Sequence, residues 1–463
     1  MTEGPRVAVI GLDCAAAPLV FGDMANEMPN IRELVGRGMH GPLASITPPI
    51  TVPAWACSMT GNTPGQLGIY GFRNRKDNTY GGLSIATSES VKEPAVWDLL
   101  GRRGMKSLLI GVPPSYPPKP VDGWQVSCFL TPPSARSFTH PADLQAEIEE
   151  ELGGEPYIFD IPNFREKGMA HVLKQVFVMT KRRFQVARRL LRTKPWDFFM
   201  MVEMGLDRLQ HVFWQCWDPG HPKYEPGNPY ESVFHDYCRY LDSEIGSLLE
   251  TLPEDVVTIV MSDHGARRME GGVCVNDWLM REGYLAMTES LSGKTPIARA
   301  PIDWGRTAAW GDGGYYGRVF LNVKGREPQG VVSPERYEEV RDELIAKLEA
   351  ALGPDGNPLG TRAFRPQEVY PDVRGVAPDI IVYFGDLSWR SVGTVGNPDV
   401  FTYENDTGPD GANHDRAGIF VMKGLPGQPL GRVEGLNLID VGPSILRMFD
   451  IQTPETAAGR SFL

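Results

Sequence analysis

Short, continuous apolar runs recur along the chain and are separated by longer amphipathic stretches. An apolar run of strand length without polar alternation is typical of a strand buried on both faces of a parallel sheet. The pattern predicts strands at residues 6–12, 107–112, 198–202, 256–261 and 418–422. Amphipathic helices are expected between several of them, including residues 172–191 and 237–252. This order predicts an α/β fold with a mostly parallel central sheet and helices on both faces.

The texture of the sequence changes between about residues 271 and 410, where Gly- and Pro-rich loops surround one well-marked helix. Ser333 suits its N-cap, Pro334 its first position and Gly353 the position after its end. A chain of 463 residues exceeds the usual size of one domain. We therefore expect a core of residues 1–270 and 411–463, with an insertion at about 73–195, and an inserted lid or substrate subdomain at 271–410.

Charge and composition narrow the possible partners. The 46 basic and 58 acidic side chains give a net charge of −12, and no basic run appears, so a nucleic acid polymer is not expected. No apolar segment reaches the length of a membrane span and no signal-like N-terminal segment is visible, which predicts a cytoplasmic protein without a membrane partner. Six scattered cysteines without C-x-x-C spacing indicate reduced, mainly structural thiols. The oligomeric state is left open.

The first chemical signal stands at the end of the fourth predicted strand. Asp263 and His264 follow it directly, and Gly265 then permits a tight turn. Two adjacent side chains that bind divalent cations, at the carboxyl end of a buried strand, suggest a metal site. Asp13 occupies the same position after the first strand, where a helix cap or turn is the alternative. Because such residues also occur in ordinary turns, further ligands are needed from other strand ends.

Those ligands are found after the third strand and before the last. Asp207 and His211 are four residues apart, so on a helix they share one face and reach one cation, with an intrahelical hydrogen bond as the alternative. His414 lies in a glycine-led loop that leads back to the sheet. Three aspartates and three histidines suffice for two divalent cations. Imidazole ligands favour zinc, with manganese or iron next.

A nucleophile is offered by the segment around Thr51. Pro53 suits the first turn of a helix and Gly61 its end, which puts Thr51 at or just before the helix N-terminus. There the free backbone amides and the helix dipole favour an alkoxide and a phosphoryl oxygen. A hydroxyl bound to a divalent metal also loses its proton more readily. Thr51 is therefore a candidate to attack phosphorus, and a plain helix cap is the alternative.

Together these residues resemble the alkaline phosphatase superfamily and, within it, the type I phosphodiesterase and nucleotide pyrophosphatase group. The matching motifs, in the order of the family, are Gly11-Leu12-Asp13, residues 28–34, residues 51–61 with Pro64 and Gly68-Ile69, Asp207 with His211, residues 262–265, and His414. The resemblance implies an alkaline-phosphatase-like core with two zinc sites bridged by Thr51, one held by Asp13, Asp263 and His264 and the other by Asp207, His211 and His414. It also implies in-line attack by Thr51 and a phosphothreonine that water hydrolyses.

Departures from the family refine the expected activity. Thr51 with Pro53 replaces the Cys-x-Pro-x-Arg motif of sulfatases, and threonine instead of serine argues against the phosphoglycerate mutase branch. Phe72 stands where many nucleotide pyrophosphatases have an asparagine, and Arg73 or Asn74 is the expected substitute. The resemblance thus favours the phosphohydrolase and phosphomutase-like members of the group.

We expect a metal-dependent phosphohydrolase that cleaves a phosphodiester or pyrophosphate bond in a small phosphorylated metabolite. A phosphomonoesterase or phosphonate hydrolase with the same site, a phosphotransferase or mutase, and a non-catalytic metal- and phosphate-binding protein are the alternatives. Arg267 is a further candidate for binding phosphate, with a solvated surface charge as the alternative. Aromatic side chains of the expected lid suit either a sugar or base or simple packing against the core, namely Trp304, Trp310, Tyr315 and Tyr316.

Overall fold

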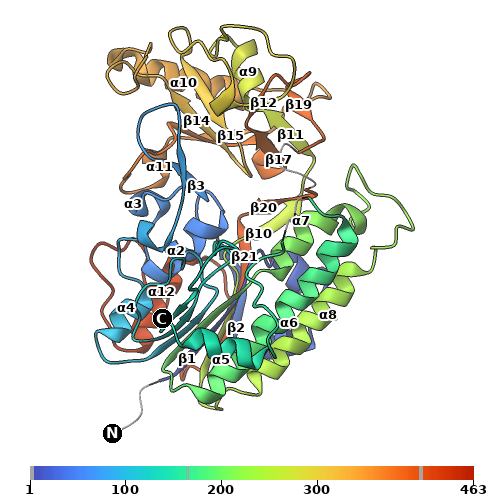
Figure 1. Ribbon diagram of the computed structural model, residues 1–463, viewed down its shortest axis with the longest axis vertical. Helices are drawn as coiled ribbons and strands as arrows, with labels where there is room; N and C mark the ends of the chain where they lie inside the picture. The colour runs from blue at the N-terminus through green and yellow to red at the C-terminus, as the bar shows by residue number, and fades with distance from the viewer. Residues whose placement is uncertain (1–4, 163, 165, 406–409) are drawn as a thin grey trace.

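A ten-stranded sheet runs through the centre of the molecule (Figure 1). The computed structural model describes residues 5–162, 164, 166–405 and 410–463. Hydrogen-bonded neighbours in this sheet follow the order β22 (Gly431–Arg432), β2 (Met39–Ala44), β21 (Ala417–Lys423), β9 (Val257–Met261), β1 (Val7–Leu12), β8 (Phe198–Glu203), β5 (Ser107–Ile110), β6 (Gly123–Val126) and β7 (Thr139–His140), and β23 (Leu436–Asn437) pairs with β2.

The middle of this sheet is parallel. Strands β9, β1, β8, β5 and β6 pair in parallel with one another in that order. Strand β21 runs antiparallel to β9 and β2, and β7 runs antiparallel to β6. Every residue of β1, β8 and β9 is buried, as expected for apolar strands covered on both faces. The predicted α/β fold is confirmed, and all five predicted strands belong to this sheet.

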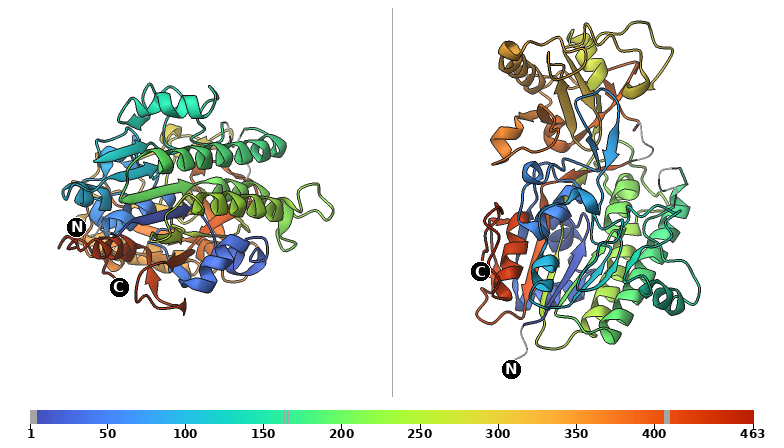
Figure 2. Two further views of the ribbon diagram at one scale, coloured as in Figure 1. Left: turned by 90° about the horizontal axis from the view of Figure 1, so that it is seen from below. Right: turned by 60° about the vertical axis from the view of Figure 1, so that its left-hand side comes forward.

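Helices cover both faces of the sheet (Figure 2). One layer contains α5 (Leu144–Glu151), α6 (Met169–Thr193), α7 (Gly205–Trp217) and α8 (Val233–Leu249), with α1 (Pro29–Arg37) packed against α8. The opposite layer contains α2 (Thr51–Thr60), α3 (Pro64–Leu67), α4 (Val96–Gly101) and α12 (Val441–Met448). The amphipathic patterns at 172–191 and 237–252 correspond to α6 and α8. Among the described residues, no helix has the length and apolar character needed to cross a bilayer.

A second hydrophobic cluster, formed mainly by residues between 273 and 389, lies beyond one end of the main sheet, at the top of Figure 1. The strands of this region are β11 (Gly271–Cys274), β13 (Ala309–Asp312), β14 (Gly317–Leu321), β15 (Arg362–Phe364), β16 (Ile380–Tyr383), β17 (Trp389–Val392) and β19 (Phe401–Thr402), with short strands β12 (Thr295–Pro296) and β18 (Thr394–Val395) and helices α9 (Val275–Arg281) and α10 (Tyr337–Glu349). Helix α11 (Pro366–Val369) packs instead in a smaller cluster with Tyr70 and Tyr316. The boundaries of the core and of the inserted subdomain stay predictions.

The helix expected after Ser333 has a different start and end from those predicted. Residues Pro334–Arg336 form a 3-10 turn, and α10 begins only at Tyr337. The Ser333 side chain makes no capping hydrogen bond, and α10 ends at Glu349, before Gly353. Pro334 thus starts a tight turn that leads into the α-helix.

The interval 73–195, expected as an insertion, supplies β5, β6, β7 and α6 to the central fold. Its first part is a hairpin of β3 (Arg73–Arg75) and β4 (Leu83–Ile85) that reaches the second cluster (Figure 1). Within this hairpin Tyr80 stacks on Trp304, with ring centroids 3.8 Å apart, and lies 5.6 Å from Trp310. These two tryptophans therefore pack the hairpin against the second cluster.

Candidate metal centre and active site

The predicted site residues meet at one edge of the central sheet. Asp13 directly follows β1, Asp263 and His264 follow β9, and Asp207 lies in the first turn of the helix that follows β8. Since these three strands are parallel neighbours, their carboxyl ends lie side by side. The backbone N–H of Asp13 also donates to the carbonyl of Glu203, at 2.9 Å, and this hydrogen bond joins the end of β1 to the end of β8.

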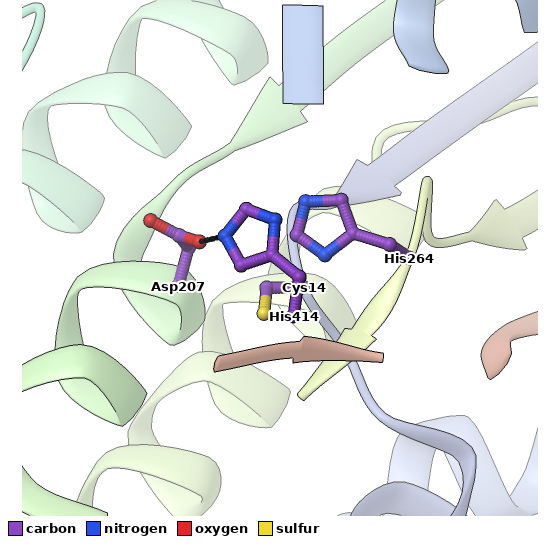
Figure 3. Close-up of side chains that lie close together, drawn as sticks. All are labelled: Cys14, Asp207, His264 and His414. Carbon is purple, nitrogen blue, oxygen red and sulfur yellow. Dashed lines mark ion pairs between the residues drawn. The ribbon is translucent and has the colours of Figure 1, made fainter. Parts of the chain in front are cut away.

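His414 reaches this edge from the far end of the sequence. Strands β10 (Gly265–Arg268) and β20 (Ala412–Asp415) pair antiparallel, with Ala266 opposite His414. The imidazole rings of His264 and His414 then stack with centroids 3.9 Å apart (Figure 3). A short antiparallel pairing of two strands far apart in sequence therefore replaces the loop expected around His414.

The first group of candidate ligands consists of Asp13, Asp263 and His264, all fully buried. His264 Nε2 lies 3.2 Å from Asp263 Oδ2 and 3.8 Å from Asp13 Oδ1. The Trp55 indole N–H donates to Asp13 Oδ2 at 2.7 Å and fixes that carboxylate. A Cβ on Gly11 would lie 2.6 Å from the Trp55 ring, so glycine in β1 allows the indole to approach.

The second group consists of Asp207, His211 and His414. Asp207 Oδ1 lies 3.2 Å from His211 Nε2 and 3.6 Å from His414 Nε2. The two Nε2 atoms are 3.3 Å apart. Within the described part of the chain, Asp207 Oδ1 and Asp263 Oδ2 are buried oxygens without a hydrogen bond. Each group thus leaves one carboxylate oxygen without a donor, which indicates a place for a cation.

The hydrogen-bond partners of the three histidine Nδ1 atoms show which way the lone pairs of the Nε2 atoms point. His264 Nδ1 contacts the carbonyl of Gly265 at 3.0 Å, His414 Nδ1 that of Pro49 at 2.8 Å, and His211 Nδ1 the Asp410 carboxylate at 2.8 Å. Because these partners only accept hydrogen bonds, each neutral ring carries its proton on Nδ1. The lone pair on each Nε2 then faces the buried carboxylates, an arrangement that a metal ion satisfies.

Electrostatics in the site agree with that interpretation. Burial and the negative charge of Asp207 hold the pKa of Asp13 well above its ordinary value, and burial and Asp13 do the same for the pKa of Asp263. Burial lowers the pKa of His264 to about 4, and burial with the adjacent His264 holds the pKa of His414 well below its usual value. Although burial opposes the shift, Tyr315, Asp410 and Asp207 raise the pKa of His211 well above its usual value. His264 and His414 are therefore the neutral imidazoles among these crowded carboxylates, and a divalent cation stabilises such a donor set.

Thr51 is the first residue of α2, and its hydroxyl points into the site. Its Oγ1 lies 3.1 Å from His264 Nε2 and 3.4 Å from Asp13 Oδ1. Ile50 occupies the N-cap, so Thr51 does not cap the helix, and Pro53, the third helical residue, lies in the first turn as predicted. The helix ends as predicted at Gly61, whose φ of 70° favours glycine.

A cleft of about 490 Å³ lies beside these groups. The side chain of Arg208 lines it and is clamped by Asp160 through contacts of 2.7 and 2.9 Å, while also donating to Asp207. Tyr315 lines it too and stacks on His414 with centroids 4.0 Å apart. The other guanidinium and aromatic side chains of the lining are those of Arg73, Arg318, Arg390, Phe72, Phe164 and Tyr316.

A sequence profile described as type I phosphodiesterase / nucleotide pyrophosphatase matches residues 7–414. The chain belongs to this family. It is accordingly a hydrolase that acts on phosphoric ester bonds. The match confirms the predicted resemblance and includes every candidate ligand from Asp13 to His414.

Solved structures of family members share the fold. Human ectonucleotide pyrophosphatase / phosphodiesterase 5 is 14% identical with a TM-score of 0.58, over 99% of this chain and 97% of that one. Its murine counterpart is 14% identical with a TM-score of 0.57, over 97% and 96% of the two chains. An inactive variant of the murine protein, solved in complex with AMP, gives the same values. A comparison with curated proteins finds no match.

The three predicted substrate-binding residues have different surroundings in this family member. Arg73 is exposed and lines the cleft. Asn74 closes a turn, because its Oδ1 accepts from the N–H groups of Tyr70 and Gly71 at 2.8 and 3.2 Å. Arg267 donates to the backbone carbonyl of Asp386. Only Arg73 of the three is among the residues that line the described cleft.

Several neighbours of the site were not predicted from the sequence. Arg208 had a signal, since it directly follows Asp207 in the same motif. Asp160 and Asp410 had none, because they lie in irregular segments that only the folded chain brings to the sheet edge. Tyr315 was predicted only as one of four aromatic side chains of the lid, and not as a neighbour of His414.

Proposed function

We propose that this chain is a metal-dependent phosphohydrolase with Thr51 as its nucleophile. Attack of Thr51 on phosphorus cleaves a phosphodiester or pyrophosphate bond in a small phosphorylated metabolite. The observation that carries the proposal is the position of the Thr51 hydroxyl. It stands at a helix N-terminus, 3.1 Å from His264 Nε2 and 3.4 Å from Asp13 Oδ1. A buried hydroxyl between two candidate metal ligands suits a nucleophile.

Two divalent cations are proposed, most simply zinc, because the ligands mix imidazole and carboxylate groups. The first would be held by Asp13, Asp263 and His264 and the second by Asp207, His211 and His414. The Thr51 hydroxyl lies beside the first of these groups and would be a further ligand. When bound, the ions supply positive charge that favours the deprotonated hydroxyl and the charge that develops on the phosphoryl oxygens.

In the reaction, a bond forms between Thr51 Oγ1 and phosphorus while the bond to the leaving oxygen breaks. The leaving group departs opposite Thr51 and takes up a proton from solvent. Water then hydrolyses the phosphothreonine, which frees phosphate or phosphomonoester and restores the hydroxyl. The free N–H groups at the start of α2 stabilise phosphoryl oxygens throughout.

The cleft supports a small substrate with more than one anionic oxygen. Its volume of about 490 Å³ lies within the range typical of small-molecule sites. The side chains of Arg73 and Arg208 bring guanidinium groups to the lining of the cleft, and Tyr315 offers an aromatic face. The AMP complex of the murine relative supports a phosphorylated metabolite of this size.

A cytoplasmic location is proposed as well. Its support is the state of the six cysteines, which are all unpaired and buried.

The preferred bond is tested with two chromogenic esters. We expect kcat/KM to be higher for bis(p-nitrophenyl) phosphate than for p-nitrophenyl phosphate, because a cleft beside the site accommodates the second ester group. The reverse order would assign a phosphomonoesterase to the same site. Transfer of labelled phosphate to an added alcohol in place of water would assign a phosphotransferase.

The contact between Trp55 and Asp13 gives a further prediction. Trp55→Phe removes the indole N–H that orients Asp13, and such outer contacts typically contribute about 10- to 100-fold to metal affinity. We expect a loss of this size in zinc affinity, measured by competition with a coloured chelator. Trp196→Phe is the matched control, because Trp196 is also buried but donates to the Leu191 carbonyl. Equal affinities in the two variants would contradict the role of Trp55.

A further inference from the structure

Cys14 directly follows Asp13, and its thiol lies among the candidate metal ligands. The sulfur and one ligand atom each of Asp207, His264 and His414 all lie within 4.8 Å of one another (Figure 3). The Cys14 side chain is buried, with 1% of its surface exposed. Its position therefore differs from that of a thiol that only fills space in an apolar core.

The backbone around Cys14 holds the thiol in this place. Its φ of 63° lies in the left-handed region, where glycine is favoured and a residue with a side chain is uncommon. The N–H of Cys14 donates to Asp263 Oδ1 at 3.2 Å, and its Sγ contacts the carbonyl of Gly265 at 3.3 Å. The chain thus keeps a side chain where glycine would be less strained.

An independent observation points to a ligand at the same place. Asp207 Oδ1 is buried and, in the described structure, accepts no hydrogen bond. The Nδ1 atom of His414 contacts the carbonyl of Pro49, which puts the proton of the neutral ring on Nδ1. The lone pair on Nε2 of His414 then faces Asp207 Oδ1, at a distance of 3.6 Å. A cation between two acceptors that face each other across a buried space stabilises both of them.

We propose that the sulfur of Cys14 is a ligand of the cation held by Asp207 and His414. The thiol loses its proton to solvent when the ion binds, and the sulfur adds a soft donor to the imidazole and carboxylate ligands. A sulfur donor favours zinc over manganese or magnesium. The inference rests on the proposed function only in requiring that this site binds a metal.

X-ray absorption at the zinc edge of the zinc-loaded, full-length protein tests this assignment. We expect a zinc–sulfur shell at about 2.3 Å in addition to nitrogen and oxygen ligands. Cys14→Gly should lose that shell, and it suits the left-handed backbone, so its folding is not at risk. Cys14→Ala should behave in the same way. Cys238→Ala, which removes a buried thiol from α8, is the control that keeps the shell.

The outcomes separate this inference from the proposed function. Zinc bound by nitrogen and oxygen alone in the unmodified protein would overturn the role of Cys14 and leave the proposed metal centre intact. A sulfur shell that persists in Cys14→Gly would also overturn it. Failure of the unmodified protein to bind zinc, manganese or iron would overturn both proposals.

Discussion

Replacing Thr51 with alanine is expected to lower kcat by about 10⁴- to 10⁶-fold, the size of effect seen when an enzyme loses its nucleophile. The hydroxyl is the group that bonds to phosphorus, and Oγ1 is placed 3.1 Å from His264 Nε2 and 3.4 Å from Asp13 Oδ1. Steady-state hydrolysis of bis(p-nitrophenyl) phosphate measures the change. The six other candidate ligands remain, so metal content and thermal stability should change little.

Two further variants sharpen this test. Thr51→Ser keeps a hydroxyl at the start of α2 and should retain much of the activity. Thr60→Ala removes a hydroxyl from the other end of the same helix, where it donates to the Ala56 carbonyl and accepts from the N–H of Asn62, and should leave kcat unchanged. Acid quenching during turnover should trap a phosphate on Thr51, identified by mass spectrometry. Intact hydrolysis by Thr51→Ala would rule out Thr51 as the nucleophile.

Much of the fold and of the candidate site was predictable because parallel strands impose strong constraints. Continuous apolar runs marked β1, β8 and β9, and residues at the carboxyl ends of adjacent parallel strands must converge. Asp13, Asp207 and Asp263 were therefore predicted to be close together before any tertiary contact was known. The helical spacing of Asp207 and His211 was equally reliable, because it depends only on the geometry of one helix.

The remaining features depend on contacts between segments far apart in sequence. Nothing local marks Asp160 as the partner of Arg208 or places Tyr315 against His414, since irregular loops bring both to the sheet edge. Asn74 looked suited to a phosphate, yet its side chain is used by the turn at Tyr70. Turn chemistry and substrate binding use the same residue types, so sequence alone does not separate them.

The strand and helix that carry Asp207 are joined by a buried ion pair. Arg183 Nη1 lies 3.3 Å from Glu203 Oε2, and at most 2% of either side chain is exposed. Glu203 Oε1 accepts from the Thr180 hydroxyl and from the N–H of Gly205, each at 2.9 Å. Gly205 begins α7, two residues before Asp207. The carboxylate of Glu203 therefore fixes the start of the helix that supplies one candidate ligand group.

Removing one partner of such a pair leaves a buried charge without compensation. Arg183→Met is accordingly expected to lower the free energy of unfolding by about 3–5 kcal/mol, measured by urea denaturation with circular dichroism. Adding Glu203→Gln should recover part of the loss, because the uncompensated charge is then gone. The control Arg37→Met breaks an exposed pair with Glu33 and should cost no more than about 1 kcal/mol. Equal effects of Arg183→Met and Arg37→Met would show that α7 does not depend on the buried charge.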